Sequence, residues 1–190
     1  MEREYYRTFI GLPLQVEQAF LDARNELLAS LSGERISWTI PEQFHVTLRF
    51  LGDIEQGTVQ RIGAALVDGL SVPKQIRLYT TGLGSFGPRR RPRVLWVGFE
   101  GNSFFGHLKQ EVDRVLELCG FQGEEQPFRA HLTLGRIRSL RNLEKYYHTV
   151  NEMNQDFVDS VLFDRLVFYR SVLSPQGPRY LVLEDLRFPR

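Results

Sequence analysis

The chain has 190 residues, 42% of them hydrophobic and 25% charged, which is typical of a soluble globular protein with a sizeable core. Its net charge of +1 gives no sign of a polyanion partner, so any basic surface must be local. The single cysteine excludes an internal disulfide framework, and neither a signal sequence nor a run of ~18 apolar residues is found. We therefore expect a cytoplasmic protein without a membrane span.

Apolar spacing predicts the elements of the first half of the chain. Apolar residues at every second position indicate strands, and those at every third or fourth position indicate helices. Pro13 ends the first strand and Gly33 ends the first helix. In chain order the pattern predicts a strand, a helix, a short strand, a longer strand and a helix at 5–13, 16–31, 37–40, 44–52 and 59–70.

The second half contains a comparable series of elements, which indicates a structural duplication. A basic hairpin loop at 87–92 joins its first two strands. The predicted elements are strands at 75–86 and 93–100, a helix at 105–119, a strand at 130–137, a polar helix-compatible stretch at 140–155, and closing strands at 157–173 and 179–188. Short links between strands favour antiparallel pairing, so the fold class is α+β.

One short motif occurs in both halves of the chain. It reads His-Val-Thr-Leu at 45–48 and His-Leu-Thr-Leu at 131–134, and uses two of the four histidines. Apolar residues at 44, 46, 48 and 50, and at 132 and 134, alternate with the polar ones. In a strand this spacing places His and Thr on one face and the apolar residues on the other, toward a core. Each motif therefore presents a polar pair away from the core.

The paired motifs suit displacement at phosphorus. Histidine titrates near neutral pH, so one ring can take a proton from water while the other protonates a leaving oxygen. A threonine hydroxyl can donate a hydrogen bond to a phosphate oxygen whose charge grows in the transition state. We therefore predict that His45, His131, Thr47 and Thr133 face each other around one phosphate. The chain lacks a cluster of metal-ligand residues, so we expect no metal and no cofactor.

With these motifs the chain resembles the 2H phosphoesterase superfamily, and within it the RNA 2′,3′-cyclic phosphodiesterases once called 2′-5′ RNA ligases. The resemblance covers essentially the whole chain. It rests on Arg-Thr-Phe-Ile-Gly at 7–11, the two motif segments at 45–52 and 131–136, Arg-Val-Leu-Trp-Val-Gly at 93–98, and Gly-Pro-Arg-Tyr at 177–180. One departure is Ala130, because members often carry proline immediately before the second motif histidine. Proline supplies no catalytic group, so this change concerns only the loop path.

The resemblance implies a single bilobal catalytic domain over 1–190. Its two antiparallel sheets would have helices outside, and each pseudo-twofold duplicated lobe would carry one motif strand beside a central cleft. It also implies metal-independent hydrolysis of RNA 2′,3′-cyclic phosphate ends to 2′-phosphomonoesters, and in some members reversible 2′-5′ ligation. By position, His45 would be the proton donor and His131 the proton acceptor, while Thr47 and Thr133 would hold the phosphate.

Further side chains are candidates for binding the RNA. Arginines at the hairpin and beside the second motif can bind flanking phosphates, and two strand aromatics can stack a base, although alternation favours core packing for both. These candidates are Arg89, Arg90, Arg91, Arg129, Arg136, Phe44 and Trp96.

Two alternatives to the cyclic phosphodiesterase stay open at this point. A protein of the same fold can be a non-catalytic RNA-binding module, which predicts salt-sensitive binding without hydrolysis. The same chemistry can also act on a small cyclic nucleotide or a 2′-5′ oligonucleotide. The intact His and Thr of both motifs favour an enzyme that acts on RNA ends, and we expect it to be a monomer.

Overall fold

A computed structural model describes residues 4–124, 127–175 and 177–190 of the chain. The strands are β1 (Tyr5–Pro13), β2 (Arg35–Trp38), β3 (His45–Glu55), β4 (Ile76–Phe86), β5 (Val94–Phe99), β6 (His131–Ser139), β7 (Ser160–Phe163), β8 (Arg165–Ser174) and β9 (Gly177–Arg187). The helices are α1 (Gln18–Ser30), α2 (Gln56–Gly69), α3 (Asn102–Leu118) and α4 (Leu143–Glu152), with short 3-10 helices η1 (Pro41–Gln43) and η2 (Asn154–Phe157).

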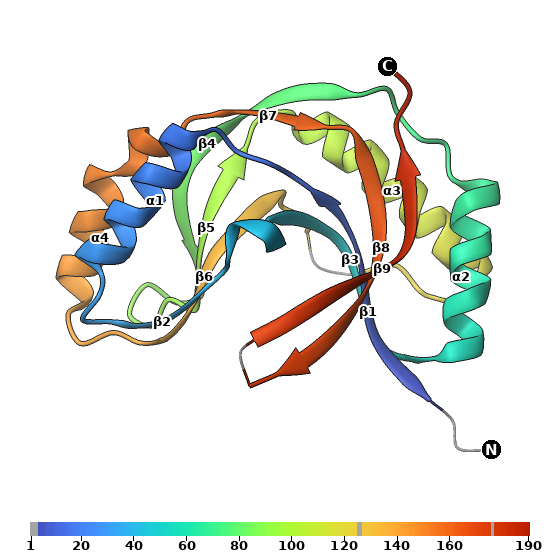
Figure 1. Cartoon of the computed structure of the whole chain (residues 1–190), viewed down its shortest axis with the longest axis horizontal. Coiled ribbons are helices and arrows are strands. Elements are labelled where there is room, and N and C mark those ends of the chain that lie inside the picture. Colours follow the sequence, from blue (N-terminus) through green and yellow to red (C-terminus); the bar gives the residue numbers. More distant parts are fainter. Residues whose placement is uncertain (1–3, 125–126, 176) are drawn as a thin grey trace.

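The strands form one curled antiparallel sheet in the order β7-β4-β5-β6-β3-β1-β8-β9, with β2 paired to β6 (Figure 1). The two motif strands, β3 and β6, are neighbours at its centre, where Val46 lies opposite Leu132. The two predicted antiparallel sheets are therefore the halves of one sheet. We call β1, β3, β8 and β9 with α2 and α3 the first lobe, and β2, β4, β5, β6 and β7 with α1 and α4 the second lobe.

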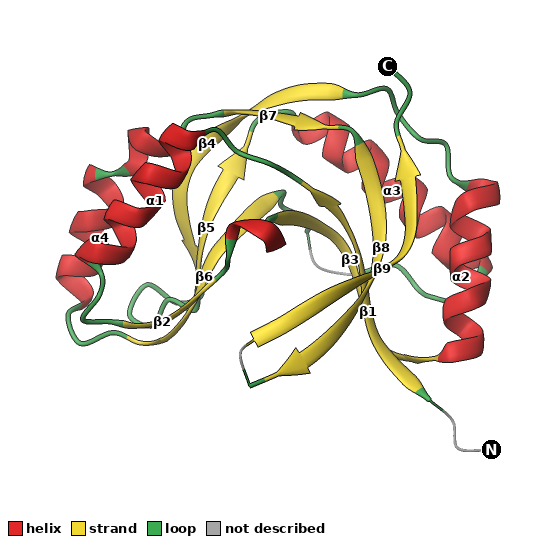
Figure 2. Ribbon diagram, viewed as in Figure 1, coloured by secondary structure: helices red, strands yellow, loops and turns green. Residues whose placement is uncertain are grey.

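Helices cover the outside of each lobe, as Figure 2 shows, but the lobes are not consecutive pieces of sequence. Helix α1 follows β1 of the first lobe, yet it packs against η2 and α4 of the second. Helix α3 follows β5 of the second lobe, yet it packs against β3 and α2 of the first. The duplication predicted along the sequence is therefore interleaved in space.

Both motif strands contain a bulge at the same position of the motif. Thr47 pairs with Gly11 and Arg49 with Ile10, so Leu48 is an extra residue in β3. In β6, Thr133 pairs with Trp96 and Gly135 with Leu95, which leaves Leu134 as the extra residue. A bulge places two successive residues on one side of the strand. The two motifs thus share an irregularity as well as their residue types.

The bulge explains where the predicted alternation fails in β3. Leu48 and Arg49 are both buried, and Phe50 is 45% exposed instead of facing the core. The Arg7 guanidinium lies 4.7 Å from the centre of the Phe50 ring. The apolar face that was predicted from the sequence therefore ends at Leu48.

The closing segment 157–173 was predicted as one strand, but it is divided. Phe157 ends η2, β7 then pairs with β4 of the second lobe, and β8 pairs with β1 and β9 of the first. Asp164, between β7 and β8, accepts a backbone hydrogen bond from the amide of Phe188 through its carbonyl oxygen. The partner strands therefore change at Asp164. Apolar residues continue on both sides of it, so the sequence pattern does not reveal that the strand is divided there.

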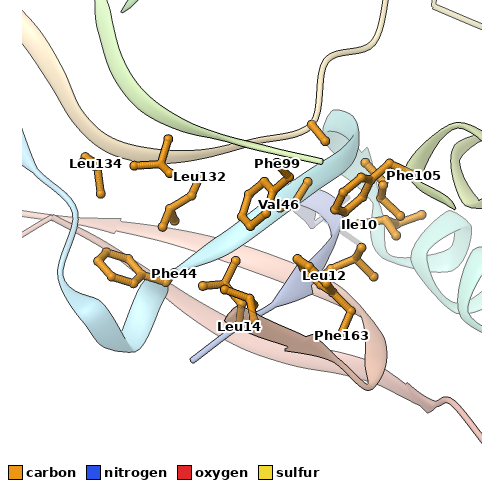
Figure 3. Packing of buried hydrophobic residues seen from close by; sticks show 14 of the residues in the cluster. Ile10, Leu12, Leu14, Phe44, Val46, Phe99, Phe105, Leu132, Leu134 and Phe163 are labelled. Atoms are coloured by element: carbon orange, nitrogen blue, oxygen red, sulfur yellow. The ribbon is translucent and has the colours of Figure 1, made fainter. Parts of the chain in front are cut away.

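Apolar residues of the two motif strands meet in one core (Figure 3). Val46, Leu132 and Leu134 are fully buried, and Phe44 packs in the same cluster. The histidine and threonine of each motif are only half-buried, as alternation requires. Burial of the apolar face therefore fixes the direction of the polar face, which is how the core positions the site.

A charge cluster with two buried cations, Arg49 and Lys109, holds the segment that precedes the second motif. The Arg49 guanidinium, which is 7% exposed, donates a hydrogen bond to the carbonyl oxygen of Gln122. It also lies 3.4 Å from the Asp113 carboxylate and 3.5 Å from that of Glu124. Lys109 pairs with the same two carboxylates at 2.5 and 3.1 Å. Arg49, which follows the first motif in β3, therefore holds the loop around Gln122 that precedes the second motif.

Replacing Arg49 by methionine is expected to lower the free energy of unfolding by about 2 kcal/mol, because the carbonyl oxygen of Gln122 loses its charged donor and the half-buried Asp113 carboxylate keeps one cation in place of two. Urea denaturation measures this change as a lower midpoint. Arg61→Met is the matched control on the exposed face of α2, and its effect should stay within about 0.5 kcal/mol. Equal midpoints for the Arg49 variant and the wild type would mean that the cluster contributes no stability.

Candidate active site

A cavity of about 660 Å³ lies between the two lobes. Its walls come from β2, η1, β3 and β6, and from the turn between β8 and β9. His45, Thr47 and Thr133 line it, together with Arg136. The structure thus brings three of the four motif residues to one cavity, and their approach follows from the pairing of β3 with β6.

The two motif histidines are held in the same way. Nδ1 of His45 donates a hydrogen bond to the carbonyl oxygen of Gln43 at 2.7 Å, and Nδ1 of His131 donates to that of Arg129 at 2.8 Å. A carbonyl oxygen only accepts, so each Nδ1 carries the proton, and in the neutral ring Nε2 keeps a lone pair. Each ring is therefore oriented by the backbone two residues before it, with Nε2 available for proton transfer.

Aromatic rings surround His45. The centres of the Phe9 and Tyr180 rings lie 4.9 and 5.3 Å from that of His45, and Tyr180 meets it edge-on. Burial lowers the pKa of His45 to about 4, against the opposing effect of the hydrogen bond to Gln43. The charges of His131 and Arg136 contribute to this lowering of the pKa. His45 is therefore neutral at pH 7 in the ligand-free protein.

His131 has a similar but separate environment. The edge of Phe86 lies against its ring at a centre distance of 4.8 Å, with Trp96 at 6.5 Å. Burial lowers the pKa of His131, the hydrogen bond to Arg129 opposes this, and the charges of Arg136 and Arg129 add to the lowering. Arg136 lowers the pKa of both histidines, and the strands that carry them are paired at Val46 and Leu132.

Five arginines were predicted to bind RNA, and they occupy different places. Arg136 lines the cavity. The Arg129 guanidinium lies 4.4 Å from the centre of the Trp96 ring, and the Arg129 backbone orients His131. Arg90 and Arg91 line a second cavity of about 250 Å³, and the carbonyl oxygen of Arg89 accepts a hydrogen bond from the Tyr147 hydroxyl at 2.9 Å. Only Arg136 of this set lies among the residues that line the motif cavity.

Burial corrects the prediction that Phe44 and Trp96 stack a base. Phe44 is 3% exposed and packs edge-on against Phe20, and Trp96 is 6% exposed. Trp96 also packs against Phe86 and the Arg129 guanidinium, and with so little exposed surface neither aromatic presents an open ring face to a base. Both aromatics pack in the interior, as the alternation of apolar residues favours. The Trp96 ring lies beside that of His131.

Two residues of the site were not singled out from the sequence. Gln43 orients His45 through its carbonyl oxygen, and its side-chain amide donates to the carbonyl oxygen of Pro178 at 2.5 Å. It therefore connects the first motif to the β8–β9 turn. Tyr180 lines the cavity beside His45. The segment 177–180 carried a signal for Tyr180 as part of the resemblance, whereas nothing in the sequence pointed to Gln43.

The part of the chain that the structure describes contains neither a candidate metal cluster nor a helix suited to span a membrane. No group of three or more His, Cys, Asp or Glu side chains there is arranged to hold a metal ion. None of the helices described is both long and apolar enough to cross a membrane.

Comparisons with known proteins show the family to which the chain belongs. The family described as LigT-like phosphoesterases matches residues 10–96. An RNA 2′,3′-cyclic phosphodiesterase of Aeropyrum pernix is 36% identical over 147 residues, which are 77% of this chain and 82% of the relative. An enzyme of the same name from Thermotoga maritima is 30% identical over 188 residues, covering 96% of this chain and 95% of the relative.

Solved structures give the same fold. A protein of Thermus thermophilus superposes with a TM-score of 0.69 at 23% identity, covering 96% of this chain and 97% of that one. Escherichia coli LigT without ligand gives a TM-score of 0.69 at 17% identity, covering 98% and 99%. With the duplicated motif, the shared fold and the relatives at 30% identity or more, this chain belongs to the LigT-like phosphoesterases of the 2H superfamily.

Proposed function

We propose that this protein hydrolyses 2′,3′-cyclic phosphate ends of RNA to 2′-phosphomonoesters. The observation that carries the proposal is the duplicated His-Thr pair, whose two rings are oriented alike through Nδ1 and stand on two strands that pair with each other. The name of the relatives, RNA 2′,3′-cyclic phosphodiesterase, supports RNA ends as the substrate. The site would lie in a single bilobal domain formed by residues 1–190, each lobe supplying one motif strand.

In the proposed reaction, His131 acts as the base and His45 as the acid. Nε2 of His131 takes a proton from water while the water oxygen forms a bond to phosphorus. The bond from phosphorus to the 3′ oxygen breaks, Nε2 of His45 protonates that oxygen, and the phosphate stays on the 2′ oxygen. The Thr47 and Thr133 hydroxyls donate hydrogen bonds to the non-bridging oxygens, whose charge grows in the transition state.

Protonation of His45 depends on the substrate in this scheme. The low pKa of His45 makes its ring neutral at pH 7 when no phosphate is bound. A phosphodiester carries a negative charge, and a negative charge nearby favours the imidazolium form. Binding of the substrate is therefore expected to raise the pKa of His45 and so to supply the acid.

The same arrangement suits a joining reaction. When a 5′-hydroxyl replaces water as the nucleophile, His131 takes its proton and the 3′ oxygen leaves as before. The product is then a 2′-5′ phosphodiester instead of a 2′-phosphomonoester. We include this reversible ligation in the proposal as a second use of the site.

The pH dependence of kcat/KM tests the two-histidine scheme, since it reports the pKa values of the free enzyme. The active form has one protonated and one neutral histidine. Both pKa values are lowered from 6.5, so the bell-shaped profile should reach its maximum below pH 6.5 and fall as pH rises above it. Initial rates on a cyclic-phosphate RNA from about pH 3.5 to about pH 9 cover both limbs of the profile. A maximum well on the alkaline side of neutrality would contradict the scheme.

The proposed function itself is tested by incubating a 2′,3′-cyclic-phosphate RNA with the protein in EDTA. The expected product is the 2′-phosphate, formed at the same rate as without the chelator. Hydrolysis to a 3′-phosphate would contradict the roles of the two histidines, and loss of activity in EDTA would contradict metal independence. Salt-sensitive binding without any product would identify the RNA-binding module instead.

A further inference from the structure

Arginines continue the row of site residues along β6. Because the bulge at Leu134 adds one residue, Arg136 and Arg138 follow Thr133 on the same side of the strand, while Leu134, Gly135 and Ile137 are buried. Arg136 and Arg138 are exposed, and both line the motif cavity. One edge of the proposed active site is thus a strand that continues outward as a row of positive charges.

The second cavity, of about 250 Å³, extends this row. Arg90, Arg91 and Arg93 of the hairpin line it, and Arg138 lines both cavities. No aspartate or glutamate is among the described residues that line either cavity. We call Arg136, Arg138, Arg90, Arg91 and Arg93 the arginine track.

Some arginines of the chain are paired with carboxylates, whereas those of the arginine track form no ion pair with the described residues. Arg49, Arg114, Arg165, Arg170 and Arg187 each lie within 4.0 Å of a carboxylate. Among the ion pairs formed by described residues, none includes an arginine of the track. Its side-chain hydrogen bonds within that part of the chain are limited to one, from Arg138 to the Ser37 hydroxyl at 3.3 Å. With 23 acidic residues in the chain, this set of unpaired guanidinium groups is available to an anionic ligand.

The backbone of the hairpin is fixed against β6. The Arg91 amide donates to the carbonyl oxygen of Pro88 at 2.7 Å, and the Arg93 amide donates to that of Phe86 at 2.8 Å. The Arg93 carbonyl oxygen accepts from the amide of Ile137 at 2.8 Å. Binding along the track therefore needs little ordering of the backbone, which favours affinity.

We propose that the arginine track binds backbone phosphates of the RNA strand that precedes the cyclic end. This inference rests on the proposed function, because it takes the cyclic phosphate to lie at the motif residues. A 2′,3′-cyclic phosphate closes the 3′ end, so every other phosphate of the strand lies on its 5′ side. The substrate class is then an oligonucleotide and not a cyclic mononucleotide. Contacts to phosphates carry no direct base information, so recognition along the track is independent of sequence.

The test compares two substrates, a cyclic mononucleotide and a pentanucleotide with a 2′,3′-cyclic phosphate end. For the wild type, KM should be lower for the pentanucleotide. The double variant Arg90→Gln, Arg91→Gln should raise the KM of the pentanucleotide about tenfold and reduce its salt slope by about 1.4, which corresponds to two phosphate contacts on a single strand. Its kcat, and both constants for the mononucleotide, should not change.

The matched control is the double variant Arg61→Gln, Arg77→Gln. It makes the same change of net charge at two exposed positions that line neither cavity. An equal rise of KM in both double variants would show that the effect comes from net charge alone. It would contradict the proposal that the arginine track binds RNA phosphates. An unchanged KM in the track variant, or a wild type that does not distinguish the two substrates, would overturn it too.

A protein that lacks the proposed hydrolytic activity would give a result that can be distinguished from failure of the arginine track. If the wild type hydrolyses neither substrate, direct binding of the pentanucleotide, measured by fluorescence anisotropy, still tests the track. Weaker binding by the track variant than by the control supports the inference. Equal binding by the two variants overturns it.

Discussion

Replacing His45 or His131 by alanine is expected to lower kcat on a cyclic-phosphate RNA by ~10²- to 10⁴-fold, the usual contribution of one general acid or base. Each ring is oriented by a single backbone carbonyl and presents Nε2 for proton transfer. Removal of a ring therefore removes a proton-transfer group while the strand that carries it keeps its pairing. Single-turnover kinetics at saturating enzyme separates this loss from weaker binding.

The control for these variants is His107→Ala, which changes an exposed histidine of α3 and should leave kcat unchanged. The His45→Ala and His131→Ala proteins should keep the circular dichroism spectrum of the wild type. A folded variant of either motif histidine with near-normal turnover would refute its assignment. A double variant no worse than the single ones would agree with two groups that act as a unit.

Replacing Thr47 or Thr133 by valine is expected to lower kcat by about 10²- to 10³-fold, as does the loss of one donor to a developing oxyanion. Among hydrogen bonds between described residues, neither hydroxyl has a protein partner, whereas the Thr80 hydroxyl donates to the carbonyl oxygen of Phe157 at 2.6 Å. The motif hydroxyls are therefore free to donate to a phosphate. Valine keeps the shape of the side chain and removes only the donor.

Serine supplies the matched rescue for each threonine. Thr47→Ser and Thr133→Ser keep the hydroxyl, so they should recover most of the activity that the valine variants lose. The rates are compared at saturating substrate, because the effect is expected in kcat and not in KM. Valine variants with near-normal kcat would remove the threonines from the proposed phosphate clamp.

The sequence predicted much of the fold because its signals are local. Period-two alternation placed His45 and Thr47 on one face of a strand, and helical spacing found α1, α2 and α3 within a few residues of their ends. The exchange of partners at Asp164 was missed, because alternation does not say which strand lies alongside. The bulge at Leu48 was missed as well, and Phe50 was therefore assigned to the wrong face.

The sequence predicted only those residues of the candidate site that belong to the duplicated motif. The duplicated motif identified four side chains, and the pairing of Val46 with Leu132 then brings the two motif strands together. The contact of Gln43 with Pro178 joins residues 135 positions apart, and no local pattern encodes it. The arginine track likewise depends on the approach of the 87–93 hairpin to β6, which sequence spacing does not give.

The central claim is that His45 acts as the acid and His131 as the base at one phosphate. A substrate with sulfur in place of the 3′ oxygen tests this claim most directly. A thiol is several pKa units more acidic than an alcohol, so a thiolate leaves without the proton that an alkoxide needs. On a 3′-thio 2′,3′-cyclic substrate, His45→Ala should hydrolyse at nearly the wild-type rate, while His131→Ala should stay impaired. Equal impairment of both variants on this substrate, or rescue of His131→Ala instead, would contradict the assignment.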